Sequence, residues 1–239
     1  ISINEFDIPT EFTPEAISLA EQAQPVKISK GREDLRDINL ITVDGDDARD
    51  FDDAIWAEKD KNPHNLNGWR MIVAIADVAH YVSNGDPLDI DARKRGNSVY
   101  FADRVVPMLP ENLSNGLCSL KPNEDRGCLA VEITIDKFGH KKSHRFIRGV
   151  MRSKARLTYE QLEETFNGNK NACSPEIMKL AKSLRGAYNA LSDAREKRGA
   201  LNIETTEKVI KINDNGKIDS ILPRERLESH KVIEEFMVT

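Results

Sequence analysis

Residues 41–53 read Ile41-Thr-Val-Asp-Gly-Asp-Asp-Ala-Arg-Asp-Phe-Asp-Asp53, and the chain continues with Ala-Ile-Trp-Ala-Glu over residues 54–58. Apolar residues on both sides predict a strand over 38–43, an irregular acidic loop, and a second strand over 54–58. The apolar run Met71-Ile-Val-Ala-Ile-Ala76 is typical of a buried strand. Two strands joined by an acidic loop are therefore the starting point for both the fold and the site.

The remaining patterns predict hairpins and capped helices. Phe138-Gly139 separates predicted strands over 128–136 and 142–155, Asn215-Gly216 separates strands over 208–212 and 218–222, and a short strand covers 98–101. Helices are expected over 14–24, 88–95, 158–166 and 175–198, with Thr13, Thr158 and Ser174 as N-caps. We expect a mixed α/β fold with a largely antiparallel sheet and flanking helices, residues 1–30 being a linker helix region before a domain over 31–239.

The charge of the chain is concentrated in the acidic loop. The 239 residues hold 35 Lys and Arg against 40 Asp and Glu, a net charge of −5. Residues 44–53 contain six aspartates and one arginine, so the other 229 residues are neutral. A nucleic-acid partner is therefore not excluded. The three cysteines lack zinc-ligand spacing and no apolar run approaches the ~20 residues of a membrane span, so we expect a cytoplasmic protein with reduced thiols.

A basic stretch lies between Lys137 and Tyr159, which hold no Asp or Glu between them. In its second half Arg148, Arg152, Lys154 and Arg156 alternate with apolar residues, which predicts one cationic strand face. Such a face suits a phosphate backbone. The alternative is that these cations only solvate the outside of a strand.

Six aspartates in ten residues repel one another unless a bound cation balances their charge or raised pKa values keep some of them protonated. An EF-hand is excluded because, with Asp44 as position 1, positions 6 and 12 are Arg49 and Ile55 rather than Gly and Glu. A catalytic magnesium site remains, in which Asp50 and Asp52 face one side of an extended segment. The alternative is a solvated acidic loop without metal.

Several ordered motifs resemble the ribonuclease II/R family, whose catalytic domain is the RNB domain. Besides residues 41–53, they are Val73-Ala-Ile-Ala-Asp-Val78, Arg95-Gly-Asn-Ser-Val-Tyr-Phe101, Pro107-Met-Leu-Pro-Glu111, Leu113-Ser-Asn-Gly-Leu-Cys-Ser-Leu120, Ala155-Arg-Leu-Thr-Tyr159 and His230-Lys-Val-Ile-Glu-Glu235. The acidic loop is more similar to the bacterial ribonuclease R branch than to the ribonuclease II branch. The resemblance implies processive, Mg²⁺-dependent hydrolysis of single-stranded RNA from its 3′ end, releasing nucleoside 5′-monophosphates, with Mn²⁺ as a substitute.

The resemblance also implies roles for individual residues. The four acidic positions of the family fall on Asp44, Asp50, Asp52 and Asp53, with Asp44, Asp50 and Asp53 as metal ligands and Asp52 essential for chemistry. Tyr100 matches a residue that stacks on terminal bases, and Tyr159 and Glu234 match positions that distinguish RNA from DNA. Without the resemblance, these three residues would pass for ordinary core and helix positions.

The sequence departs from the family at two places. Ile203 stands where the family often has a Phe that stacks on a base, so it can pack against a base but not stack. The family's phosphate-binding arginine and its cold-shock and S1-type RNA-binding modules have no counterpart here, so we expect a truncated domain, weakly active or inactive alone, from a monomeric parent exoribonuclease. The alternatives are a non-catalytic RNA-binding fragment, a degenerate family member and a Ca²⁺-binding structural domain.

Overall fold

The computed structural model describes residues 2–101, 104–201, 208–213 and 217–239. The chain divides into two compact units. The first comprises Ile1–Gln24, Val78–Leu117 and Ile203–Glu225, and the second comprises Pro25–Asp77, Cys118–Asn202 and Arg226–Thr239. All four candidate aspartates belong to the second unit. No described helix has the length and apolar character needed to cross a bilayer.

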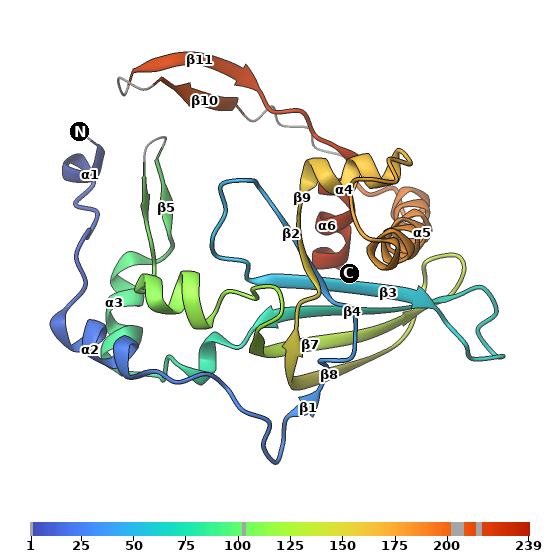
Figure 1. The fold of residues 1–239 in the computed structure, drawn as a ribbon, viewed down its shortest axis with the longest axis horizontal. Helices are drawn as coiled ribbons and strands as arrows, with labels where there is room; N and C mark the ends of the chain where they lie inside the picture. Colours follow the sequence, from blue (N-terminus) through green and yellow to red (C-terminus); the bar gives the residue numbers. More distant parts are fainter. Residues whose placement is uncertain (1, 102–103, 202–207, 214–216) are drawn as a thin grey trace. The chain divides into compact units, whose positions relative to one another are not determined.

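The second unit is built on a seven-stranded sheet in the order β1-β8-β7-β4-β3-β2-β9 (Figure 1). Its strands are β1 (Glu33–Asp34), β2 (Ile41–Asp44), β3 (Asp53–Lys59), β4 (Trp69–Ala76), β7 (Asp125–Ile135), β8 (Lys141–Arg152) and β9 (Ala155–Thr158). The four inner pairings are antiparallel, and the two pairings at the edges, β1 with β8 and β2 with β9, are parallel. The predicted mixed fold with a largely antiparallel sheet is confirmed.

Three helices cover one face of this sheet: α4 (Tyr159–Phe166), α5 (Pro175–Lys197) and α6 (Glu228–Val238) (Figure 1). The capping box predicted at Thr158 and Gln161 is present, and Ser174 caps α5 ahead of Pro175 as expected. The alternate residues of the strands and the apolar stripes of the helices form one buried core. The helix α5 packs closely on the sheet at Gly186, where a Cβ would lie 2.3 Å from the Trp69 ring.

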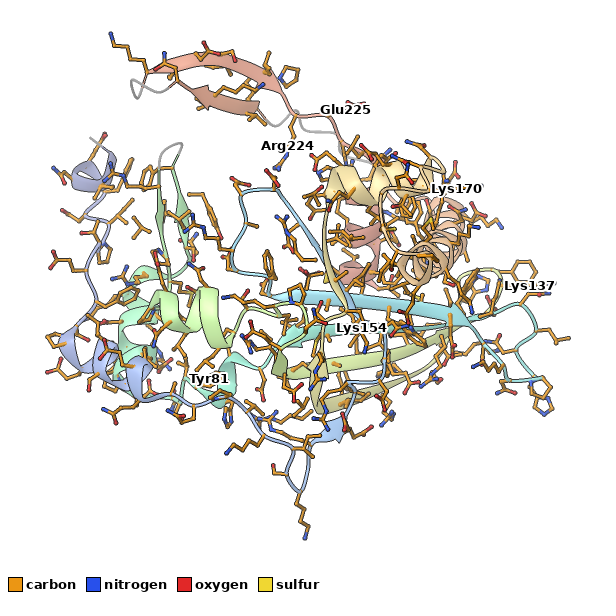
Figure 2. All side chains as sticks on the ribbon, viewed as in Figure 1. Tyr81, Lys137, Lys154, Lys170, Arg224 and Glu225 are labelled. Atoms are coloured by element: carbon orange, nitrogen blue, oxygen red, sulfur yellow. The ribbon has the colours of Figure 1, made fainter. Side chains whose placement is uncertain are left out.

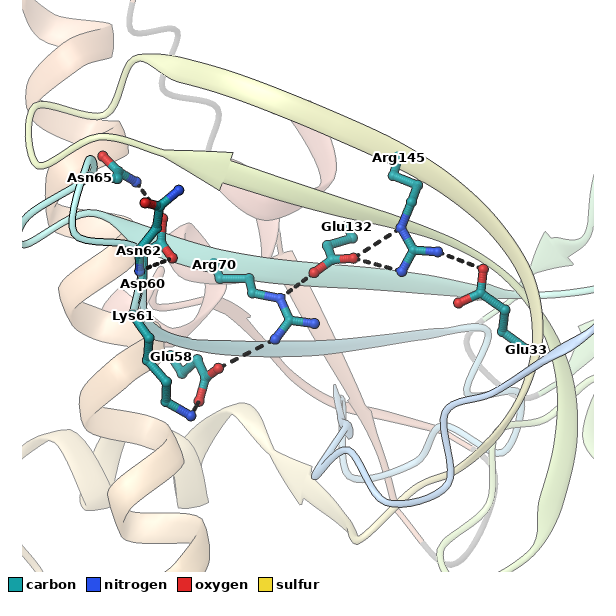
Figure 3. Close-up of polar contacts among 9 residues, drawn as sticks. All are labelled: Glu33, Glu58, Asp60, Lys61, Asn62, Asn65, Arg70, Glu132 and Arg145. Atoms are coloured by element: carbon teal, nitrogen blue, oxygen red, sulfur yellow. Dashed lines mark hydrogen bonds and ion pairs between the residues drawn. The ribbon is translucent and has the colours of Figure 1, made fainter.

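The opposite face of the sheet carries an ion-pair ladder across five strands, β3, β4, β7, β8 and β1 (Figure 3). Arg70 bridges Glu58 and Glu132, and Arg145 bridges Glu132 and Glu33. These side chains are partly exposed, so each pair contributes about 1 kcal/mol or less. The ladder keeps this face polar while the helices bury the other.

The first unit contains α1 (Ser2–Glu5), α2 (Pro14–Gln22), η1 (Val78–His80), α3 (Pro87–Arg95), β5 (Val99–Tyr100), β6 (Val105–Val106), a π-helical turn η2 (Leu113–Leu117), and the antiparallel pair β10 (Lys208–Ile212) and β11 (Ile218–Pro223). Asp91 of α3 accepts bonds from Thr13 N and Oγ1 at 2.8 and 3.0 Å, which joins the start of α2 to α3. The turn Asn215-Gly216 and Ile203 lie outside the described residues.

One predicted strand is wrong. The stretch 142–155 is not continuous: β8 ends at Arg152, and β9 begins at Ala155 and pairs with β2 at the other end of the strand order. Ser153 Oγ donates to the Ala155 carbonyl, and Lys154 N donates to Leu40 O (Figure 2, where Lys154 is labelled). Because the apolar-polar alternation continues through this break, the pattern alone predicts a single strand. Arg148, Arg152, Lys154 and Arg156 therefore do not form one strand face.

Candidate active site

The acidic loop joins two neighbouring antiparallel strands, so both of its ends lie close together. Asp44 is the last residue of β2 and Asp53 the first residue of β3. Ser119 anchors the loop between them: its Oγ donates to Arg49 O at 2.9 Å and accepts from Phe51 N at 3.1 Å. Leu120 N donates to Phe51 O, and Ala76 N donates to Asp52 O. The loop is therefore held to the sheet by its backbone.

The aspartates of the loop raise one another's pKa values. Burial and the charges of Asp44 and Asp52 raise the pKa of Asp53 to about 7. Burial and the charge of Asp52 likewise raise the pKa of Asp44 to about 6, against the opposing charge of Arg156. The pKa of Asp52 is raised by burial and by Asp50. The structure thus brings all four predicted aspartates into one electrostatic cluster, whereas the Asp46 side chain is 94% exposed.

Two carboxylate oxygens in this cluster, Asp44 Oδ2 and Asp53 Oδ2, are buried and have no hydrogen-bond partner. An unpartnered buried carboxylate is costly, and a hard divalent cation is the natural ligand for such oxygens. Among the described residues, no three His, Cys, Asp or Glu side chains stand in ready-made metal-ligand geometry. The donor chemistry fits Mg²⁺, and the side chains would have to close in to bind it.

The predicted RNA-contacting residues lie in different settings. Tyr100 is 66% exposed on β5, so it is not core packing. Tyr159, the first residue of α4, stacks on His230 of α6 with ring centroids 4.0 Å apart, and Glu234 pairs with Arg226. Arg148 binds Asp77, Arg152 binds Asp125, and Arg156 binds loop carbonyls. Ile203 lies outside the described residues.

Sequence reasoning missed three residues that shape this region: Ser119, Asp77 and His230. Each of them lies inside one of the family motifs, but its local sequence pattern does not indicate its partner. The partners are about 70 positions away in the sequence: Arg49 for Ser119, Arg148 for Asp77 and Tyr159 for His230. The three cysteines form no disulfide, as expected.

The fold and the site define a mixed α/β domain with a carboxylate cluster where two neighbouring strands meet, and comparison with known proteins identifies the family. The family model "RNB domain" matches residues 32–239, so the chain belongs to the RNB domain family. Ribonuclease R of Vibrio parahaemolyticus is 45% identical over 246 residues, which is 100% of this chain and 29% of that protein. Ribonuclease R of Escherichia coli is 42% identical, over 96% of this chain and 28% of that protein. The chain thus spans under a third of the length of these relatives.

Solved structures agree. Mycoplasma genitalium RNase R in complex with ribose methylated single-stranded RNA superposes with a TM-score of 0.92 and 29% identity, covering 99% of this chain and 37% of that one. Yeast Ssd1, described as a pseudonuclease, shares the fold with a TM-score of 0.65 at 18% identity, over 89% of this chain and 26% of that one. Since this fold also occurs in a pseudonuclease, activity must be argued from the site.

Proposed function

We propose that this chain is the metal-binding part of a 3′ to 5′ exoribonuclease that hydrolyses single-stranded RNA processively and releases nucleoside 5′-monophosphates. The observation that carries the proposal is the cluster of Asp44, Asp50, Asp52 and Asp53, with a buried unpartnered oxygen on each of Asp44 and Asp53. A solvated acidic loop would leave its carboxylates in water, whereas Asp44, Asp50 and Asp53 are half-buried.

In this proposal Asp44, Asp50 and Asp53 hold Mg²⁺ or Mn²⁺. When bound, the metal supplies Lewis-acid polarisation of a phosphoryl oxygen. Asp52 lies among the ligands, where its carboxylate orients the attacking water and takes up its proton. The backbone anchors at Ser119 and Ala76 hold these side chains in register while the RNA advances.

Substrate binding is assigned to aromatic and polar side chains outside the loop. Tyr100 offers an exposed ring on which any base can stack, which suits an enzyme indifferent to sequence. Tyr159 and Glu234 offer hydroxyl and carboxylate groups that distinguish a ribose 2′-OH from deoxyribose. Arg148, Arg152 and Lys154 contribute positive charge near the RNA backbone, and the parent protein is proposed to act as a monomer in the cytoplasm.

The alternative is a non-catalytic RNA-binding member of the family, and the pseudonuclease with the same fold keeps it open. Retention of all four aspartates favours the enzyme. A Ca²⁺-binding structural role is disfavoured by the EF-hand mismatch at Arg49 and Ile55.

The test is hydrolysis of a 5′-labelled single-stranded RNA in Mg²⁺ by the full-length parent protein and by its Asp52→Asn variant, beside the matching DNA. We expect a ladder that shortens from the 3′ end for RNA only. The variant should lose about 10²-fold or more in rate while still binding RNA, because one proton-transfer group is removed. RNA binding without cleavage by the wild-type parent protein would favour the binding module, and a fully active variant would remove Asp52 from the chemistry.

A further inference from the structure

Arg156 is placed beside the acidic loop by the parallel pairing of β9 with β2. In that register Arg156 is opposite Thr42, and Thr158 is opposite Asp44. The guanidinium therefore emerges from the strand next to β2, where that strand runs into the loop. Sequence reasoning had grouped Arg156 with a cationic strand face, but the break after Arg152 removes it from that face.

The Arg156 guanidinium contacts residues near both ends of the acidic loop. Its Nη2 donates to Gly45 O at 2.5 Å and to Asp46 O at 2.9 Å. Its central carbon lies 5.4 Å from the centroid of the Phe51 ring, within cation–π range. A planar fork with several donors can serve two adjacent carbonyls and a ring at once, which a lysine ammonium does less well. One side chain thus joins residues 45 and 46 to residue 51.

The same side chain is turned toward the protein. It is 21% exposed, and its Nε is buried without a hydrogen-bond partner. Its nearest carboxylate contact, Asp46 Oδ1, is 3.8 Å from Nη1 and belongs to a side chain that is 94% exposed. The short bonds of the guanidinium therefore go to loop carbonyls, and its positive charge lies within the field of the aspartate cluster.

We propose that Arg156 is a positioning residue that clamps the acidic loop, fixing residues 45–51 so that Asp44 and Asp50 converge with Asp53 on a divalent cation. The effect on cation binding rests on the proposed function, whereas the contacts between Arg156 and the loop do not depend on it. Its role differs from that of an RNA-phosphate contact, because its donors hold backbone carbonyls instead of facing the substrate.

The test compares Arg156→Met and Arg156→Lys with wild type, using Arg145→Met as the control. Arg145 lies on β8 in the ion-pair ladder and its side chain is 51% exposed. Its partners are Glu33 and Glu132, so its substitution removes one positive charge without removing a contact to the acidic loop. Three readouts are measured: amide hydrogen exchange of Ala48 and Phe51, Mg²⁺ binding by titration calorimetry, and binding of a single-stranded RNA in EDTA. Ala48 N bonds to Gly45 O, so its exchange reports on the clamped carbonyl.

For Arg156→Met we expect exchange at Ala48 and Phe51 to accelerate about tenfold or more, and the Mg²⁺ dissociation constant to rise about 10- to 100-fold. Arg156→Lys should give exchange rates and a Mg²⁺ dissociation constant between those of wild type and Arg156→Met, and Arg145→Met should give wild-type values. The affinity for RNA in EDTA should stay within about twofold of wild type for all three variants. If Arg156→Met weakens RNA binding in EDTA while exchange and Mg²⁺ binding stay unchanged, Arg156 is a phosphate contact and the clamp is wrong.

Should Arg156→Met fail to fold, Arg156→Lys decides the matter by the same exchange and calorimetry readouts: faster exchange with weaker Mg²⁺ binding supports the clamp, and wild-type values overturn it. Should the full-length parent protein not cleave RNA, the proposed function fails separately. Exchange at Ala48 needs neither substrate nor metal, so it still supports or overturns the clamp in that case.

Discussion

Asp77 is a fully buried carboxylate held by two arginines in the second unit, and its replacement by Ala tests how that unit is held together. Its side chain is fully buried and accepts from Arg32 Nη2 and Arg148 Nε, each at 2.7 Å, and from Arg148 Nη2 at 3.1 Å. The Arg32 side chain is only 8% exposed. Burial raises the pKa of Asp77, but the bonds from Arg148 and Arg32 outweigh it and lower the pKa overall.

The magnitude follows from what Asp77→Ala leaves behind. Arg148 is 45% exposed and can be solvated, but the Arg32 side chain is only 8% exposed and loses the carboxylate that accepts from its Nη2. Breaking a buried pair by removing one partner costs about 3–5 kcal/mol. For a chain of this size, each kcal/mol lowers Tm by about 2–4 °C, so we expect a fall of about 6–20 °C.

The assay is thermal and urea unfolding, with Asp125→Ala as the matched control. Asp125 also binds two arginines, Arg36 and Arg152, but it is 34% exposed, so its loss should cost about 1 kcal/mol or less. Because the folded pKa of Asp77 is depressed, its contribution is present above the unfolded value of about 4 and is lost as pH falls through the folded pKa. The gap between wild type and Asp77→Ala should therefore narrow below about pH 4. Equal destabilisation by the two variants would refute the reasoning from burial.

Two further predictions concern the turn at Gly139 and the metal-free site. Gly139 has φ of +83°, and a Cβ at this position would lie 2.1 Å from Ala190 O. Gly139→Ala should therefore lower the free energy of unfolding in urea by about 2 kcal/mol or more. Gly168 is also at positive φ but has open space around it, so Gly168→Ala should lower that free energy by less. In EDTA, Tm should fall as pH rises from about 4 to about 7, because the pKa of Asp53 is raised to about 7 in the fold and the folded protein therefore favours the protonated carboxyl. Mg²⁺ should reverse this fall, and a Tm independent of both pH and Mg²⁺ would contradict a cation site at the aspartates.

Local sequence signals were sufficient to predict the features that depend on interactions among a few neighbouring residues. The capping box at Thr158 and Gln161, the Ser174-Pro175 start of α5 and the turn at Phe138-Gly139 were all predicted, because each depends on side chains and backbone groups within about four positions. The clustering of the four aspartates was also predictable, since it requires only two adjacent strands joined by a short acidic loop.

Other features depend on residues far apart in sequence. The break between β8 and β9 is invisible in the alternating pattern because Lys154 N bonds to Leu40 O, 114 positions away, and β9 pairs with β2. The lack of a hydrogen-bond partner for one carboxylate oxygen on each of Asp44 and Asp53 follows from their burial in the folded chain.

The sequence by itself determined the helix caps, the hairpins and the position of the acidic loop between two strands, because propensity, capping and charge density act locally. Only the tertiary structure decided that Asp77 is locked between two arginines and that Arg156 serves the loop and not a cationic face. Those outcomes depend on strand order and burial, which set both the partner of each guanidinium and the cost of leaving its charge unpaired.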